Sequence, residues 1–162
     1  MTSVSVFIDN SISRSIKGKL HLFLGGAISF SPVIPPYSER YLAGKFLGSN
    51  SIFSFGSLSG LLIYTIENVD IYIIIFWNIP SCSLYPNRLK VQMIKTEEFN
   101  NTDITKIYNE MYQAADIKSY NIHTIESDIC EYLCNNIKYQ CIANIGSFKQ
   151  SELTINLSSI NL

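Results

Sequence analysis

One segment decides the fold of this chain: residues 71–91, IYIIIFWNIPSCSLYPNRLKV. Its first six residues, 71–76, are almost wholly apolar, which is typical of a β-strand buried on both faces. Pro80 lacks a backbone N–H and cannot extend a strand ladder, so we expect the strand to end there. A polar loop that displays Tyr85 follows, and a new strand is expected to begin near Leu89.

Further strands are predicted on both sides of this segment. Residues 3–8 alternate polar and apolar side chains and place Val4, Val6 and Ile8 on one face, as a half-buried strand does. Three prolines exclude a helix and suit an edge segment or an extended loop: Pro32, Pro35 and Pro36. The full set of expected strands is 3–8, 19–24, 41–46, 51–55, 58–66, 71–79, 89–94, 139–145 and 152–157. Many short strands separated by turn residues favour a β-sandwich or a barrel.

Two helices are predicted in the second half of the chain. The first, 103–116, is amphipathic and is capped by Thr102 or Asp103, with an inward face of Ile104, Ile107, Tyr108, Met111 and Ala115. The second, 128–135, has Ser127 as its cap and an inward face of Ile129, Leu133 and Cys134. The sequence therefore predicts a mainly β fold, a β-sandwich flanked by two α-helices, built as one domain over residues 1–162.

Composition narrows the classes of function. The formal net charge is −1 and no basic block occurs, so the chain lacks the clustered Lys and Arg that nucleic-acid binding requires. The longest apolar run, 71–79, has about half the ~20 residues of a membrane-spanning helix. The only histidines are His21 and His123, and no nucleophile or paired-carboxylate motif accompanies them. We therefore expect a binding protein without a cofactor rather than an enzyme.

Four cysteines leave several chemistries open: Cys82, Cys130, Cys134 and Cys141. In a secreted protein they could form disulfides in three ways, and the sequence does not choose among them. Cys130 and Cys134 would lie one helical turn apart, near His123, a placement compatible with a metal site. Structural zinc usually takes two short Cys or His pairs, and only one loose pair is present. Reduced thiols that pack as small apolar side chains are the favoured interpretation, with no metal bound.

Several of these segments together resemble the actinoporins, the pore-forming cytolysins of sea anemones. The strand that ends in Trp77-Asn78-Ile79-Pro80, followed by Tyr85-Pro86-Asn87-Arg88-Leu89-Lys90-Val91, is similar to that family's strand and its membrane-binding loop. Weaker similarities occur in the same order elsewhere, at residues 6–10, 60–64, 107–113 and 152–157. The resemblance implies the same β-sandwich fold and a membrane lipid as the partner.

The resemblance also implies a pocket for the phosphocholine headgroup of sphingomyelin-type lipids. Its positions fall on Asn78, Pro80, Tyr85, Tyr108 and Tyr112, with Gly25, Leu61 and Gln113 at the rim. The membrane-contact loop corresponds to Leu84, Arg88 and Leu89, where the family carries aromatic residues. Tyr108 and Tyr112 are four apart and share one helix face, and tyrosine rings hold a quaternary ammonium by cation–π attraction. Without the resemblance, both would be interpreted as half-buried core residues.

The family's pore is lined by an N-terminal amphipathic helix of several turns, and only five residues precede Val6 here. Cytolytic, haemolytic and ion-conducting activity, with assembly into a homo-oligomer on the membrane, is what the resemblance implies. Two expectations remain open: the lytic segment was removed from this sequence, or the protein binds without perforating. The family implies secretion and action at a target-cell membrane, whereas the absence of a visible signal peptide leaves a cytoplasmic location open.

A non-lytic glycan-binding module is the alternative, because fungal fruit-body lectins use a related fold. Such a module would bind sugars through exposed loop side chains, for example Asn87, Asn100, Asn101 and Tyr120. Ordinary solvated turns explain the same residues equally well.

Overall fold

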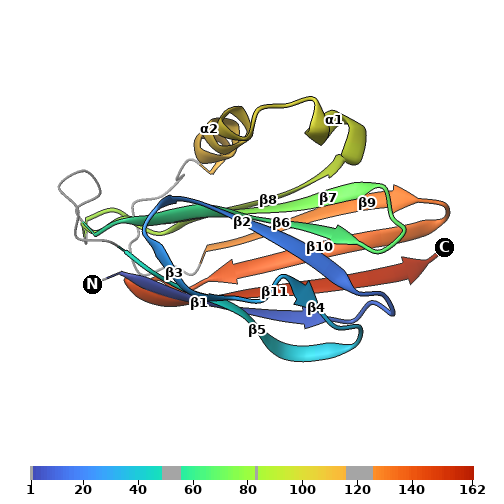
Figure 1. Ribbon diagram of the computed structural model, residues 1–162, viewed down its shortest axis with the longest axis horizontal. Coiled ribbons are helices and arrows are strands. Elements are labelled where there is room, and N and C mark those ends of the chain that lie inside the picture. Colours follow the sequence, from blue (N-terminus) through green and yellow to red (C-terminus); the bar gives the residue numbers. More distant parts are fainter. Residues whose placement is uncertain (1, 49–55, 83, 116–125) are drawn as a thin grey trace.

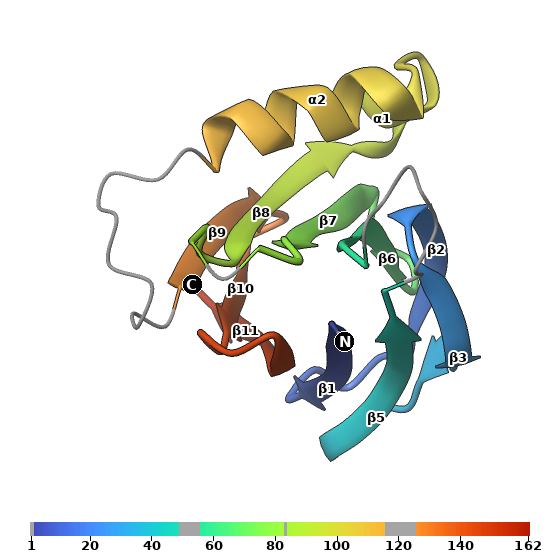
Figure 2. The same ribbon diagram turned by 90° about the vertical axis from the view of Figure 1, so that its left-hand side faces the viewer.

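The computed structural model describes residues 2–48, 56–82, 84–115 and 126–162. Within these residues two β-sheets lie face to face, and both helices cover the outer face of one sheet (Figure 1). Figure 2 looks along the strands from the end where the N-terminus lies and shows the two layers with helix α2 (Ile104–Ala114) above them.

One sheet has six strands in the order β3-β5-β1-β11-β10-β9, and the other has five in the order β4-β2-β6-β7-β8. Neighbouring strands are antiparallel except β1 and β11, which run parallel. The six-stranded sheet consists of β3 (Gly26–Phe30), β5 (Ser38–Leu47), β1 (Ser3–Asn10), β11 (Gln150–Asn161), β10 (Ile137–Ile145) and β9 (Glu126–Cys134). The five-stranded sheet consists of β4 (Val33–Ile34), β2 (Ile16–Leu24), β6 (Leu58–Ile66), β7 (Ile71–Ile79) and β8 (Arg88–Lys95).

Two apolar clusters explain why β6 and β7 are hydrophobic on both faces. The larger cluster fills the space between the sheets and includes the fully buried Trp77. The smaller cluster lies on the outside of the five-stranded sheet, where Leu61 and Phe76 meet Ile107 and Met111 of α2. The prediction of a strand buried on both faces at 71–79 is confirmed, because one face packs on the other sheet and one on the helix.

The helices follow β8 directly. Helix α1 (Thr96–Asn100) is a single short turn that the sequence analysis did not predict. Helix α2 begins after Asp103, whose side chain accepts a hydrogen bond from the backbone N–H of Thr105 at 2.8 Å, so Asp103 is the cap. None of the helices among the described residues is long and apolar enough to cross a bilayer.

Most of the predicted strands are confirmed, with ends shifted by a few residues. The edge strand β3 was missed because its side chains are mostly exposed and do not alternate. Strand β4 is a two-residue edge between prolines 32 and 35, as the prolines suggested. The strand expected at 51–55 lies outside the described residues.

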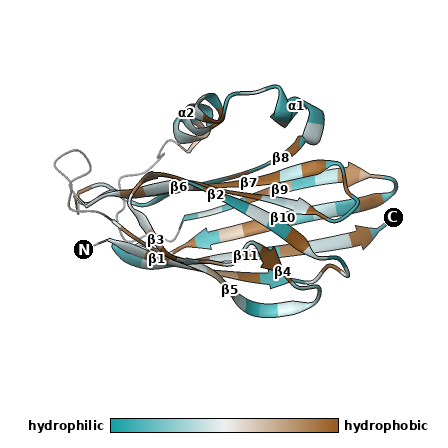
Figure 3. Cartoon of the chain, in the orientation of Figure 1, coloured by the Kyte–Doolittle hydropathy of each residue, from teal (hydrophilic) through white to brown (hydrophobic). Residues whose placement is uncertain are grey.

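The helix predicted at 128–135 is wrong, since this segment is strand β9. Burial alternates along it with a period of two: Cys130, Tyr132 and Cys134 face the core, whereas Ile129 and Leu133 are exposed. Figure 3 shows hydrophobic and hydrophilic residues interspersed along β9 and β10. Residues 135 and 136 are both asparagines with positive φ, 50° and 60°, as a two-residue hairpin turn requires. That Asn-Asn turn was the signal for a hairpin.

The fold class is nevertheless as predicted. A β-sandwich with two helices is present, but both helices precede β9, whereas the second predicted helix was placed at the position of β9 itself. The sandwich is closed at β8 and β9, where the Asp128 carboxylate accepts a hydrogen bond from the N–H of Val91 at 2.9 Å and pairs with Lys90 at 3.3 Å.

Candidate functional site

A cavity of about 310 Å³ opens at the end of the five-stranded sheet where β7 ends and β8 begins. Helix α2 forms one wall, and the β7–β8 loop forms another. The lining side chains are Leu24, Ser57, Asn78, Pro80, Tyr85, Arg88, Tyr108 and Tyr112. The structure therefore brings together the five residues that the resemblance assigned to a headgroup pocket, from two separate parts of the chain: the end of β7 with its following loop, and helix α2.

The tyrosines of helix α2 point toward the cavity because the adjacent face of the helix is fixed. Ile107 and Met111 are buried against the sheet, which turns the i and i+4 pair Tyr108 and Tyr112 toward the cavity. The ring of Tyr108 stacks on Phe23 with centroids 3.9 Å apart, and the rings of the two tyrosines lie 6.2 Å apart. The edge-on ring of Phe76 contacts both. The result is a rigid aromatic wall, of which Tyr112 remains 38% exposed.

The hydroxyl of Tyr108 is held from beneath by Ser59, a fully buried residue of β6. Ser59 Oγ donates to the carbonyl oxygen of Trp77 at 3.1 Å and lies 2.7 Å from the Tyr108 hydroxyl. The Ser59 and Tyr108 hydroxyls share one hydrogen bond in which either oxygen can be the donor, and this bond holds the Tyr108 hydroxyl in place. Burial raises the pKa of Tyr108, and the bond to Ser59 opposes this rise in part. Tyr108 is thus a neutral, fixed ring.

Arg88 is the one charged side chain among the residues that line the cavity. Its guanidinium lies over the ring of Tyr112, 4.5 Å from the centroid, in cation–π geometry. No carboxylate, thiol or imidazole belongs to the lining set. The cavity is therefore electropositive, with aromatic faces that already hold one cation.

Serines on β6 and the segment before it support the opposite side of the cavity. Ser57 Oγ accepts a hydrogen bond from the N–H of Ser81 at 3.1 Å, which fixes the chain just after Pro80. Ser57, Ser59 and Leu24 were missed by the sequence analysis. A signal was present, because Ser59 interrupts an otherwise apolar strand and pairs directly with Asn78, the other polar residue of this sheet region.

The residues assigned to the rim lie elsewhere. Leu61 is fully buried beneath α2, so a rim position is wrong. Gln113 is exposed on α2 and is not a lining residue. Gly25 has φ 102° at the turn between β2 and β3, and a Cβ there would lie 2.6 Å from the carbonyl oxygen of Leu47. Its role is to let the chain pass from one sheet to the other.

The three residues assigned to membrane contact have different positions. Leu84 is 75% exposed, and Arg88 lines the cavity. Leu89 is only 6% exposed, because residue 89 is the first inward position of β8, so a membrane-contact role for it is wrong. Asn87, proposed as an exposed sugar ligand, is 2% exposed and is also excluded from that role.

The cysteines do not form the arrangement that was weighed for a metal. Cys130 and Cys134 lie on a strand and not on one turn of a helix, and His123 is outside the described residues. Cys130 instead faces Cys141 of β10 directly. Among the described residues, no three His, Cys, Asp or Glu side chains are placed to hold a metal ion.

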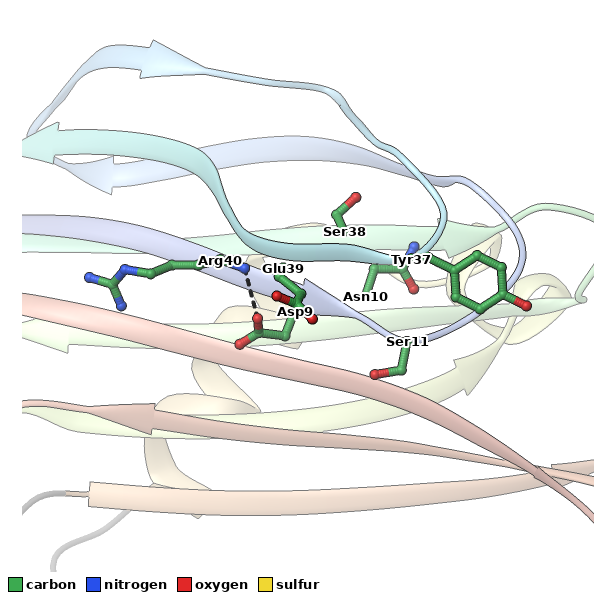
Figure 4. A pocket seen from close by; sticks show the side chains of 7 residues that line it. All are labelled: Asp9, Asn10, Ser11, Tyr37, Ser38, Glu39 and Arg40. Carbon is green, nitrogen blue, oxygen red and sulfur yellow. Dashed lines mark hydrogen bonds between the residues drawn. The ribbon is translucent and has the colours of Figure 1, made fainter.

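A second, more open depression of about 450 Å³ lies toward the opposite end of the strands, where β1 ends and β5 begins (Figure 4). Its wall includes Asp9, Glu39 and the 70% exposed ring of Tyr37. Asp9 Oδ1 accepts a hydrogen bond from the backbone N–H of Arg40 at 2.7 Å. The Arg40 side chain is engaged by Glu152 at 3.0 Å. The formal charge of this depression is therefore more negative than that of the aromatic cavity.

Comparison with known proteins supports the fold and leaves the family open. No protein-family model and no curated protein matches the chain. Among solved structures, the chain is similar to the crystal structure of the lipid-binding protein Nakanori, with a TM-score of 0.69 and 15% sequence identity over 97% of this chain and 71% of that one. At this identity the similarity concerns the fold, which is the actinoporin-like β-sandwich.

Proposed function

We propose that this protein binds membrane lipids through their phosphocholine headgroups, and that the aromatic cavity is the binding site. One observation carries the proposal: Tyr85, Tyr108, Tyr112 and Arg88 surround a single cavity on an actinoporin-like fold. The lipid-binding protein Nakanori has a similar fold, which supports a lipid as the class of ligand.

The two charges of the headgroup match the two kinds of side chain. Arg88 supplies a fixed positive charge and several donors for the phosphate oxygens. The quaternary ammonium has no proton to donate and is best held by aromatic faces, each worth about 0.5–2 kcal/mol. Tyr85 and Tyr108 offer such faces, and the position of Arg88 over the ring of Tyr112 in cation–π geometry supports a wall that attracts cations.

Sedimentation with vesicles tests the proposal. Vesicles of sphingomyelin or phosphatidylcholine should bind the protein, whereas phosphatidylglycerol vesicles, which lack the ammonium, should bind it less. Tyr112→Ala should weaken binding to phosphocholine vesicles about tenfold, or about 1.4 kcal/mol, because it removes one wall of the cavity and the ring that positions the Arg88 guanidinium. Tyr37→Ala is the matched control, since it removes an exposed tyrosine at the other depression. Equal binding by Tyr112→Ala and Tyr37→Ala would discard the site.

Pore formation is a further activity under this proposal. Release of a trapped dye from the same vesicles measures it, and cross-linking of the bound protein measures assembly into homo-oligomers. Binding with release would make the protein a cytolysin that acts on target-cell membranes from outside. Binding without release would make it a module that recognises headgroups.

Glycan binding is the second candidate function, and the depression at the other end of the strands favours it. There an exposed ring, Tyr37, stands beside the carboxylates of Asp9 and Glu39, which can accept hydrogen bonds from sugar hydroxyls. A glycan array with the wild type and Tyr37→Ala tests this candidate. Specific sugar binding that Tyr37→Ala removes would support it, and an array without any signal would reject it.

A further inference from the structure

Two turns meet at the end of the molecule that carries the aromatic cavity. One is the β7–β8 loop, residues 80–87, and the other is the β10–β11 turn, residues 146–149 (Figure 2). They expose three large apolar side chains: Leu84 and Phe148 are each 75% exposed, and Tyr85 is 58% exposed. We call Leu84, Tyr85 and Phe148 the two-loop tip. Phe148 comes from a part of the chain that the sequence analysis did not connect with the cavity.

The two turns are bonded into one unit. Asn87, which is 2% exposed, donates from its side-chain amide to the carbonyl oxygens of Gly146 at 2.7 Å and Phe148 at 2.9 Å. In the other direction, Lys149 Nζ donates to the carbonyl oxygen of Tyr85 at 2.7 Å. Phe148 is therefore held in a fixed position relative to Tyr85, which is itself a cavity residue.

The charged side chains within the two turns have one sign. In residues 80–88 and 146–150 the only charged side chains are Arg88 and Lys149, and neither segment contains an aspartate or a glutamate. A surface of lipid phosphates is attracted to such a border, whereas an acidic residue there would oppose it. Exposed aromatic and leucine side chains beside basic residues are the composition of a membrane-interface anchor.

We propose that the two-loop tip inserts into the interfacial region of a phospholipid bilayer, with Phe148 as its principal anchor. The inference rests on the proposed function, because it places the membrane surface around the headgroup cavity. Tyr85 belongs to both sites, so a lipid headgroup in the cavity and Phe148 among neighbouring lipids meet the same bilayer surface. The β7–β8 loop by itself has only one aromatic side chain, Tyr85, and the β10–β11 turn adds a second, Phe148. The two turns together therefore offer more apolar surface to a bilayer than the loop alone.

Partitioning into sphingomyelin–phosphatidylcholine vesicles tests the tip. Phe148→Ala should lower the partition coefficient about tenfold, since part of a Phe side chain leaves the membrane. Ile160→Ala is the matched control, because Ile160 is 56% exposed near the far end of β11. Both residues are exposed, so neither variant should change the circular dichroism spectrum or the thermal midpoint by more than a few degrees.

A second measurement locates Phe148 directly. In Phe148→Trp, brominated lipids should quench the new tryptophan, whereas Trp77 is fully buried and contributes an unquenched background. Titration with soluble phosphocholine, which has no acyl chain, reports on the cavity alone and should be unchanged in Phe148→Ala. Loss of vesicle binding with intact phosphocholine binding supports the tip.

Three results would overturn the inference. One is vesicle binding by the wild type with no quenching at residue 148 and no effect of Phe148→Ala. Another is wild-type protein that partitions into no vesicle. The third is reduced self-association of Phe148→Ala in sedimentation velocity with unchanged vesicle binding, which would assign the tip to a contact between copies of the chain. Vesicle quenching at 148 without any phosphocholine binding would uphold the tip and reject the proposed headgroup site.

Discussion

Replacing Asn87 by alanine should cost about 2 kcal/mol of unfolding free energy, although the residue lies in a loop. Its side chain is almost fully buried and donates to the Gly146 and Phe148 carbonyl oxygens and to Ser151 Oγ, at 2.7, 2.9 and 3.2 Å. A buried carbonyl that loses its donor costs about 1–3 kcal/mol. The Ser151 hydroxyl also reaches both carbonyls but has one proton, so Asn87→Ala leaves one of them without a donor.

Urea unfolding followed by tryptophan fluorescence measures this cost. The chain has a single tryptophan, Trp77, which is fully buried and reports on the core. Asn101→Ala is the control, because Asn101 is exposed and its substitution should change the unfolding free energy by less than about 0.5 kcal/mol. A loss below about 0.5 kcal/mol for Asn87→Ala would refute the reasoning that this amide joins the two turns.

Four further outcomes are expected. Tyr64→Phe should raise the unfolding free energy by about 1 kcal/mol, because the buried hydroxyl has no partner among the described residues. Since burial raises the pKa of Tyr64 and of Tyr108 above the ordinary value near 10, the stability that these two neutral side chains contribute should be lost as the pH rises above 10, less steeply in Tyr64→Phe; a thermal midpoint that rises above pH 10 would contradict this. Iodoacetamide should modify the exposed Cys82 first and spare Cys141, whose thiol pKa is raised by its hydrogen bond with Cys130 and by burial; peptide mass mapping gives the order, and early labelling of Cys141 would be inconsistent with the packing. Arg88→Gln should weaken headgroup binding about tenfold in a phosphocholine titration, and unchanged affinity would remove Arg88 from the phosphate site.

The parts of the fold that the sequence predicted correctly are those where one strong pattern acts alone. Residues 71–79 are too apolar and too short for anything but a buried strand, and Pro80 marks its end. In α2 the spacing of four between Tyr108 and Tyr112 is sufficient to place both on one face.

The segment 126–134 failed because two periods compete in it. Ile129 and Leu133 are four apart and suggest a helix, yet alternation of Cys130, Tyr132 and Cys134 toward the core determines the structure. Pairing with β10 selects the strand over the helix for this segment. Such pairing cannot be seen in a short stretch of sequence. The left-handed pair Asn135 and Asn136 was the local cue that favours a hairpin.

The site residues that could be predicted belong to the β7–β8 loop or to helix α2. The residues that could not be predicted hold these from strands or turns that are distant in the sequence. Ser59 acts on Tyr108 across a separation of 49 residues, and Asn87 reaches Gly146 across 59. Leu89 was assigned to the membrane-contact loop, but β8 begins at residue 88. The side chain of residue 89 therefore faces the core. The sequence did contain a signal for Phe148, because it is a single aromatic residue between polar residues of a turn. Such a residue is expected to be exposed.

The most direct test of the account is a titration of soluble phosphocholine into isotope-labelled protein, followed by backbone amide chemical shifts. The account predicts saturable shifts at Asn78, Arg88, Tyr108 and Tyr112, with no change around Tyr37. Shifts confined to Tyr37 and Glu39, or no saturable shifts at any concentration, would contradict the claim that the aromatic cavity binds lipid headgroups.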